Sequence, residues 1–111
     1  MGWCIALHGE DGERVRVRPF RGGSTAADHR LAEVDVTFNH YERFEAAGVL
    51  PASLHGRRAA DVEPLLAAAA AVLGTERDPD PWARTPGNAG WICALLASWA
   101  QEHPEATFVV V

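Results

Sequence analysis

The fold is decided by residues Trp82–Trp99, which read W-A-R-T-P-G-N-A-G-W-I-C-A-L-L-A-S-W and predict one central helix. Thr85 can cap this helix with its hydroxyl, and Pro86 then fits the first helical position, where its missing N–H costs nothing. No charged residue occurs from Thr85 to Gln101. We therefore expect this helix, over residues 86–103, to be buried nearly all round.

The two sides of this helix differ in bulk. With about 100° of rotation per residue, large apolar side chains gather on one face and small residues on the other. We expect the bulky face to pack on a sheet and the small face to contact an alanine-rich helix over residues 61–73, capped by Asp61. The bulky face consists of Trp91, Ile92, Leu95, Leu96 and Trp99, and the small face of Gly90, Ala94 and Ala97.

Hydrophobic patterning predicts the remaining elements. A short helix is expected between Asn39, as its N-cap, and Gly48, with Tyr41 and Phe44 on its buried face. Residues 19–28 are expected to form a loop. Alternation of apolar and polar residues favours four strands, over residues 3–8, 14–18, 33–38 and 107–111. The first two are expected to form a hairpin.

Together these elements predict an α+β fold, with an antiparallel sheet of about four strands and three helices packed mainly on one face. The length of 111 residues fits one domain. Within this domain we distinguish an N-terminal hairpin and loop, residues 1–34, from an α+β core, residues 35–111.

Charge and cysteine content narrow the functional classes. The net charge is −5, and residues 61–111 account for it with seven acids and two arginines. Nucleic-acid-binding proteins usually carry the opposite sign, so this class is disfavoured. Two cysteines, Cys4 and Cys93, are too few for a disulfide framework or a cysteine-based zinc site. No signal peptide or membrane span is visible, so we expect a cytoplasmic protein.

From Asp35 to Val111 the pattern resembles that of small uncharacterised proteins of bacteria, prophages and phages, with the form T-x-N … HG … W-x-x-TPGNAG. The resemblance implies a compact α+β domain and no particular activity. It is carried by Thr37, Asn39, Phe44, Gly48, His55-Gly56, Leu65-Leu66, Trp82, Thr85–Gly90, Leu95-Leu96, Trp99-Ala100, Pro104 and Ala106.

The turn Thr85–Gly90 is the main candidate for a binding site. Free N–H groups at a helix start carry partial positive charge, and glycine lets a phosphate or carboxylate come near. The turn lacks the Gly-Lys-Ser/Thr of a phosphate loop. Alternatively, the glycines serve packing and Asn88 satisfies a buried loop. If a small anionic ligand or nucleotide binds here, we expect around it Asn39, His55, Trp82, Thr85, Gly87, Asn88 and Gly90.

Catalytic and metal motifs are not recognisable in the sequence. The five histidines form no H-x-x-x-H or H-E-x-x-H pair, and we expect neither a metal ion nor a cofactor. His40 and His55 are candidates for a general base, but no serine or cysteine has the setting of a nucleophile. Arg14, Arg16 and Arg18 share a strand face, which either meets an acidic partner or is solvated beside acidic neighbours.

These observations favour a non-catalytic interaction protein that acts on a protein partner or as a homodimer. A sheet edge left open by the hairpin or the C-terminal strand would invite pairing between copies. A binder of a small anionic ligand at the start of the third helix is the alternative. A small enzyme using His40 or His55 is the third interpretation.

Overall fold

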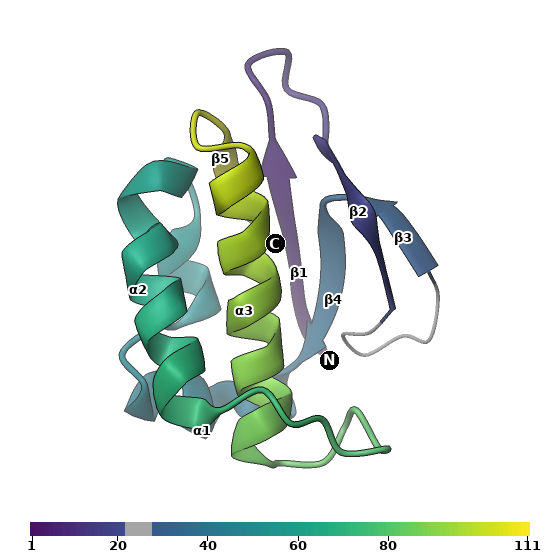
Figure 1. Ribbon diagram of the computed structural model, residues 1–111, viewed down its shortest axis with the longest axis vertical. Helices are drawn as coiled ribbons and strands as arrows, with labels where there is room; N and C mark the ends of the chain where they lie inside the picture. The colour runs from purple at the N-terminus through teal and green to yellow at the C-terminus, as the bar shows by residue number, and fades with distance from the viewer. Residues whose placement is uncertain (22–27) are drawn as a thin grey trace.

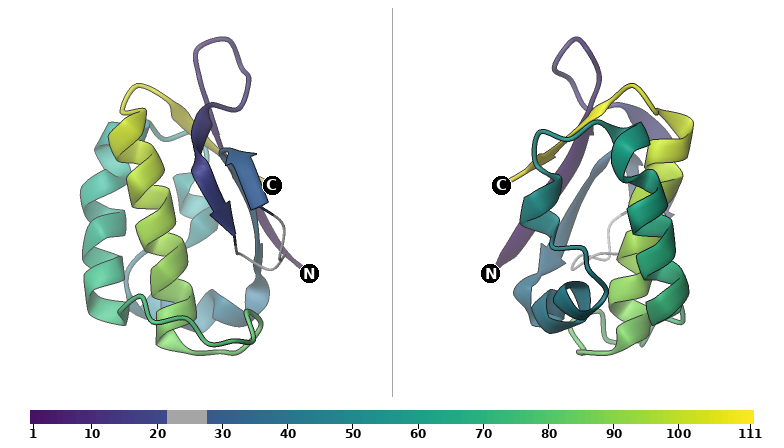
Figure 2. Two further views of the ribbon diagram at one scale, coloured as in Figure 1. Left: turned by 45° about the vertical axis from the view of Figure 1, so that its right-hand side comes forward. Right: turned by 90° about the vertical axis from the view of Figure 1, so that its left-hand side faces the viewer.

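The computed structural model describes residues 1–21 and 28–111, whose elements form two main layers (Figure 1). One layer is an antiparallel sheet in the order β4 (Glu33–Thr37), β1 (Gly2–His8), β5 (Thr107–Val110). The helices α2 (Ala59–Leu73) and α3 (Pro86–Glu102) cover one face of this sheet (Figure 2). The expected α+β fold, with an antiparallel sheet and helices on one face, is confirmed.

Strand β1 lies in the middle of the sheet and exposes its two faces to different surroundings. Alternate side chains are buried on the helical face, whereas Cys4 and His8 point the other way and are half-buried. In the described part of the chain, no helix covers this second face (Figure 2). The first segment therefore supplies the central strand of the core, and residue 34 marks no structural boundary. The strand residues buried on the helical face are Trp3, Ile5, Leu7, Val34, Val36 and Phe108.

A second, two-stranded sheet replaces the expected hairpin between the first two strands. β2 (Arg16–Arg21) pairs with β3 (Asp28–Leu31) and not along β1. The hairpin survives only as one bridge between His8 and Arg14. Pro19, expected in a loop, lies inside β2, where the pairing register is irregular. Residues 22–27 of the expected loop lie outside the described part of the chain.

Packing against α3 explains why β2 leaves β1. Phe20 of β2 meets Trp99 of α3 edge to face, with 5.4 Å between ring centroids. The ring nitrogen Nε2 of His103 lies 2.7 Å from the carbonyl oxygen of Arg16. Strand β2 therefore buries its apolar side chains against α3. Pairing with β1 in a hairpin would not by itself bury them.

The short helix α1 (Tyr41–Ala46) is entered through a 3-10 turn, η1 (Phe38–His40). The expected cap, Asn39, is wrong, because Thr37 caps the turn by accepting the backbone N–H of Asn39 at 3.2 Å. The Asn39 side chain bonds elsewhere, as described below.

The burial of α1 also differs in part from the expectation. Phe44 is buried as expected, but Tyr41 is 45% exposed. Gly48 has φ +80° and follows the helix in the left-handed region, as expected. A second 3-10 turn, η2 (Pro51–Leu54), leads to α2, which begins two residues before Asp61.

Helix α3 has the expected cap and a slightly rotated buried face. Thr85 Oγ1 accepts the backbone N–H of Asn88 at 3.2 Å. Trp91 and Leu95, expected on the buried face, are only half-buried. No helix among the described residues is long and apolar enough to cross a membrane. The large side chains buried on α3 are Ile92, Cys93, Leu96 and Trp99.

Candidate functional site

The loop of residues 78–85, just before α3, is held in place by one buried amide. Asn88 is 4% exposed. Its Oδ1 accepts the backbone N–H of Asp78 at 2.9 Å. Its Nδ2 donates to the carbonyl oxygens of Asp80 at 3.0 Å and Ala83 at 2.9 Å. Both ends of the amide are therefore occupied by the loop.

Three side chains from η1 and α1 also bond to this loop. Because a carbonyl can only accept, the His40 ring must carry its proton on Nε2. Asn88 bonds the carbonyl oxygens of residues 80 and 83, and these three side chains bond those of residues 81, 82 and 84. All five consecutive carbonyl oxygens therefore accept a hydrogen bond from a side chain. These further bonds run from Asn39 Nδ2 to Trp82 O (3.0 Å), from His40 Nε2 to Pro81 O (3.2 Å) and from Arg43 Nη2 to Arg84 O (3.3 Å).

Gly87 and Gly90 mark a close contact between two backbones. A Cβ at Gly87 would collide with the carbonyl group of Glu76, and one at Gly90 with the carbonyl group of Gly74. The small face of α3 therefore packs on the end of α2 and the segment that follows it. These are the contacts that a packing role of the two glycines requires.

Apart from the two glycines, the predicted site residues divide into one hydrogen-bond network and one residue that lies elsewhere. Asn39, Trp82, Thr85 and Asn88 meet in the bonds that shape the loop. His55 lies at the sheet instead, where its Nδ1 accepts the backbone N–H of Val110 at 3.0 Å. No contact among the described residues joins His55 to the turn. The geometry favours the packing interpretation, because an anion site would need the side-chain amide of Asn88, and this amide is already bonded to the loop.

His40 is buried among apolar groups and is poorly placed to act as a base. Its Nδ1 has no hydrogen-bond partner among the described residues, and its ring meets Phe44 edge to face. Burial lowers the pKa of His40 below its ordinary value of 6.5, although the bond to Pro81 acts in the opposite direction. At neutral pH the ring is neutral, and its Nε2 donates to the carbonyl oxygen of Pro81 in the loop.

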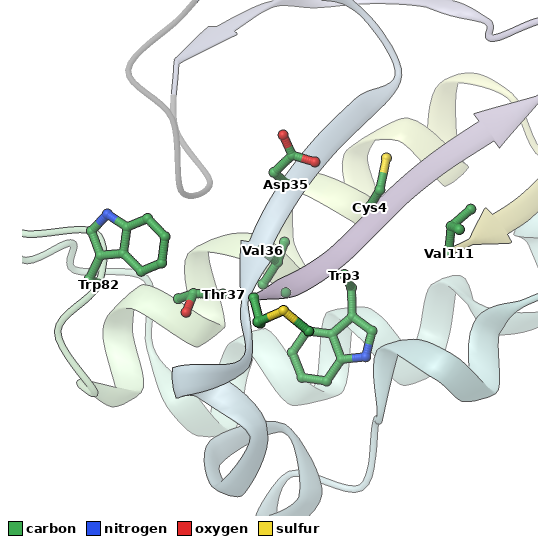
Figure 3. A pocket seen from close by; sticks show the side chains of 9 residues that line it. Trp3, Cys4, Asp35, Val36, Thr37, Trp82 and Val111 are labelled. Carbon is green, nitrogen blue, oxygen red and sulfur yellow. The ribbon is translucent and has the colours of Figure 1, made fainter.

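A hollow of about 260 Å³ opens beside this loop, on the uncovered face of the sheet (Figure 3). In Figure 3 Cys4 and Asp35 project from neighbouring strands, with Val111 on one side and Trp82 on the other. The β1 and β4 residues come together because Cys4 is paired with Asp35 in the sheet register. The hollow is lined by Met1, Gly2, Trp3, Cys4, Asp35, Val36, Thr37, Trp82 and Val111.

Three aromatic residues of η1, α1 and the loop are exposed, and we call them the aromatic surface: Phe38, Tyr41 and Trp82, of which Trp82 lines the hollow. They are 42%, 45% and 45% exposed, respectively. Phe38 and Tyr41 rest on the buried Trp3, with ring centroids 4.7 and 6.4 Å away. Aromatic residues are enriched at the interfaces of proteins relative to the rest of their surface. Sequence analysis singled out Trp82 alone, because the exposure of the other two depends on how α1 packs.

The hollow is acidic and its thiol is unreactive. Burial raises the pKa of Cys4 above its ordinary value, and the charges of Glu33 and Asp35 raise it further. The thiol therefore stays protonated at neutral pH and is a weak nucleophile. Burial also raises the pKa of Cys93 to about 12. Thiolate chemistry is therefore disfavoured at both cysteines.

No protein-family model, curated protein or solved structure matches this chain. Among residues 1–21 and 28–111, no three His, Cys, Asp or Glu side chains gather as metal ligands. Function must therefore be inferred from the hollow and the aromatic surface.

Proposed function

We propose that this chain is a non-catalytic, cytoplasmic interaction protein that self-associates through the aromatic surface and the hollow beside it. The observation that carries the proposal is the setting of Trp82. Nearly half of this residue is exposed, yet each carbonyl oxygen from residue 80 to residue 84 accepts a hydrogen bond from a side chain of another element. The indole is therefore displayed on a loop whose backbone is fixed.

A fixed aromatic residue suits binding for a thermodynamic reason. Association costs free energy when loops and side chains lose their freedom at the interface. Here the loop is ordered before any partner arrives. Tryptophan and tyrosine are also the residues whose truncation most often weakens protein interfaces strongly. The aromatic surface therefore combines the residue types and the rigidity of a binding site.

The sheet offers its face, and not its edges, to a second copy. The outer side of β5 is already occupied, because Phe108 exchanges hydrogen bonds with Gly56 and Arg57, and Val110 donates to His55. The edge strand β4 carries the carboxylate of Asp35, which has no ion-pair partner among the described residues and would repel the same strand of another copy. Edge pairing, which the sequence suggested, is thereby disfavoured.

Analytical ultracentrifugation tests this proposal. We expect the chain of 12.0 kDa to sediment as a dimer at high micromolar concentration and to dissociate on dilution. Trp82→Ala and Tyr41→Ala should each weaken dimerisation by about 2 kcal/mol, roughly thirtyfold in Kd. Val72→Ala is the matched control, since Val72 is an apolar residue that is 77% exposed elsewhere, on α2. A wild-type chain that stays monomeric at all concentrations would contradict the proposal.

A further inference from the structure

One carboxylate side chain at the hollow, that of Asp35, has no ion-pair partner among the described residues. Glu33, on the same face of β4, is neutralised by Arg14, whose Nη1 lies 2.9 Å from Glu33 Oε2. Asp35 forms no ion pair with any described residue, and the Cys4 thiol that donates to it is uncharged. A negative charge is thus left at the wall of a hollow that is otherwise largely apolar.

The surroundings of this carboxylate fit a guanidinium group. Trp82 lines the same hollow and offers an indole ring, which attracts a cation placed over its face. A planar guanidinium can stack on an indole and at the same time donate hydrogen bonds to a carboxylate. A compact ammonium group is less suited to making both contacts at once. The volume of about 260 Å³ is far larger than the roughly 30 Å³ that one water occupies, so a side-chain head group has room.

The chain itself carries a suitable cation in the loop whose Trp82 lines the hollow. It has no lysine, and its ten basic residues are all arginine. Arg84 is exposed and lies two residues beyond Trp82 in the same fixed loop. Its carbonyl oxygen is bonded to Arg43, but its guanidinium has no partner among the described residues. The exposed guanidinium of Arg84 is therefore available to a second copy.

We propose that Arg84 of a second copy enters the hollow and pairs with Asp35, beneath the indole of Trp82. The inference rests on the proposed self-association and specifies its chemistry. In a two-fold dimer every contact occurs twice, so Arg84 of each copy would meet Asp35 of the other. The charge complementarity between one loop and the neighbouring hollow selects a second copy as the occupant.

The pairing is tested by charge removal and charge exchange. Asp35→Asn and Arg84→Gln should each raise the dimer Kd by about tenfold or more in sedimentation measurements at low salt. The exchanged variant, with Asp35→Arg and Arg84→Asp together, should recover most of the lost affinity, because both pairs are rebuilt in reverse. Glu33→Gln and Arg57→Gln are control variants that remove one charge of each sign at other positions, and they should leave Kd unchanged. Thermal melts verify that every variant is folded.

The outcomes separate this inference from the proposed function. If the wild type dimerises but Asp35→Asn and Arg84→Gln do not change Kd, the pairing is wrong and self-association stands. If both single variants weaken the dimer and the exchanged variant does not recover, direct pairing is likewise overturned. If the wild type never dimerises, the proposed function itself fails.

Discussion

At the scale of single residues, buried polar side chains hold one loop in place. Asn88 and His40 both bond to this loop, and neither side chain is accessible to a ligand. His40 donates to a carbonyl from Nε2, and its buried Nδ1 has no hydrogen-bond partner among the described residues. A second proton on this ring would add a charge and an N–H group with no acceptor, which is costly in a buried site. The loop therefore depends on the neutral form of His40.

The stability of the protein should consequently depend on pH through His40. Above its ordinary pKa of 6.5, His40 is neutral in both folded and unfolded chains and adds no pH dependence. Below about pH 6.5 the unfolded chain binds a proton that the folded chain resists, so the free energy of unfolding falls until the lowered pKa is reached. Each unit of lowering corresponds to about 1.4 kcal/mol.

Urea unfolding of the wild type and of His40→Gln, across this pH range, measures the effect. Glutamine can still donate to Pro81 but does not titrate. The wild type should lose more stability on acidification than the variant, while contributions from the other histidines cancel. Parallel pH profiles of the two proteins would show that His40 does not carry this dependence.

At the scale of elements, small residues allow α3 to pack closely against the end of α2. Gly90 lies against the backbone at the end of α2, where Gly74 adopts φ +78° and leaves the helix. A glycine inside a helix normally costs about 1 kcal/mol relative to alanine. Glycine is nevertheless required at this position, because no larger residue fits between the two backbones. The glycines that interrupt the helical pattern are thus explained by packing.

Gly90→Ala should therefore destabilise the fold, against the helix propensity of alanine. The added Cβ meets a backbone carbonyl that cannot rotate away, so we expect a loss of about 1–3 kcal/mol or more by overpacking. Ser98→Ala, an exposed substitution in the same helix, should change stability by less than about 0.5 kcal/mol. Chemical denaturation compares them. A stabilised Gly90→Ala variant would refute the close contact.

At the scale of the whole molecule, Trp99 connects the parts of the fold. It is buried on α3 and meets Phe20 of the second sheet. Trp82, by contrast, contributes only its backbone to the loop network, and its indole faces the hollow. The four tryptophans therefore serve different purposes, with one at the centre of the core and one displayed for contact.

These two tryptophans should respond differently to truncation. Trp99→Ala leaves a large void and should lower the free energy of unfolding by about 3–5 kcal/mol, a major part of the roughly 5–15 kcal/mol available to a domain. Trp82→Ala should stay within about 0.5 kcal/mol of the wild type, as exposed substitutions usually do. Denaturant titration of the two variants gives both values. Equal losses would mean that Trp82 is part of the core.

The elements that could be predicted from the sequence are those specified by near neighbours. Thr85 and Pro86 define the start of α3, because a cap and a first-turn proline act within one turn of the chain. The alternation of Trp3, Ile5 and Leu7 identifies β1 for a similar reason, since opposite faces of a strand need opposite side chains. The α+β class follows from these local patterns.

Only the tertiary structure decided the pairings and the surface. Phe20 draws β2 to α3 and away from β1, across about eighty residues of sequence. Asn39 reads locally as a cap, but its amide bonds the carbonyl of Trp82, 43 residues away. The hollow arises where strands far apart in sequence meet, so no short motif could reveal it. Local geometry specifies helices and strands, whereas the arrangement that creates a site depends on long-range contacts that the sequence pattern does not record.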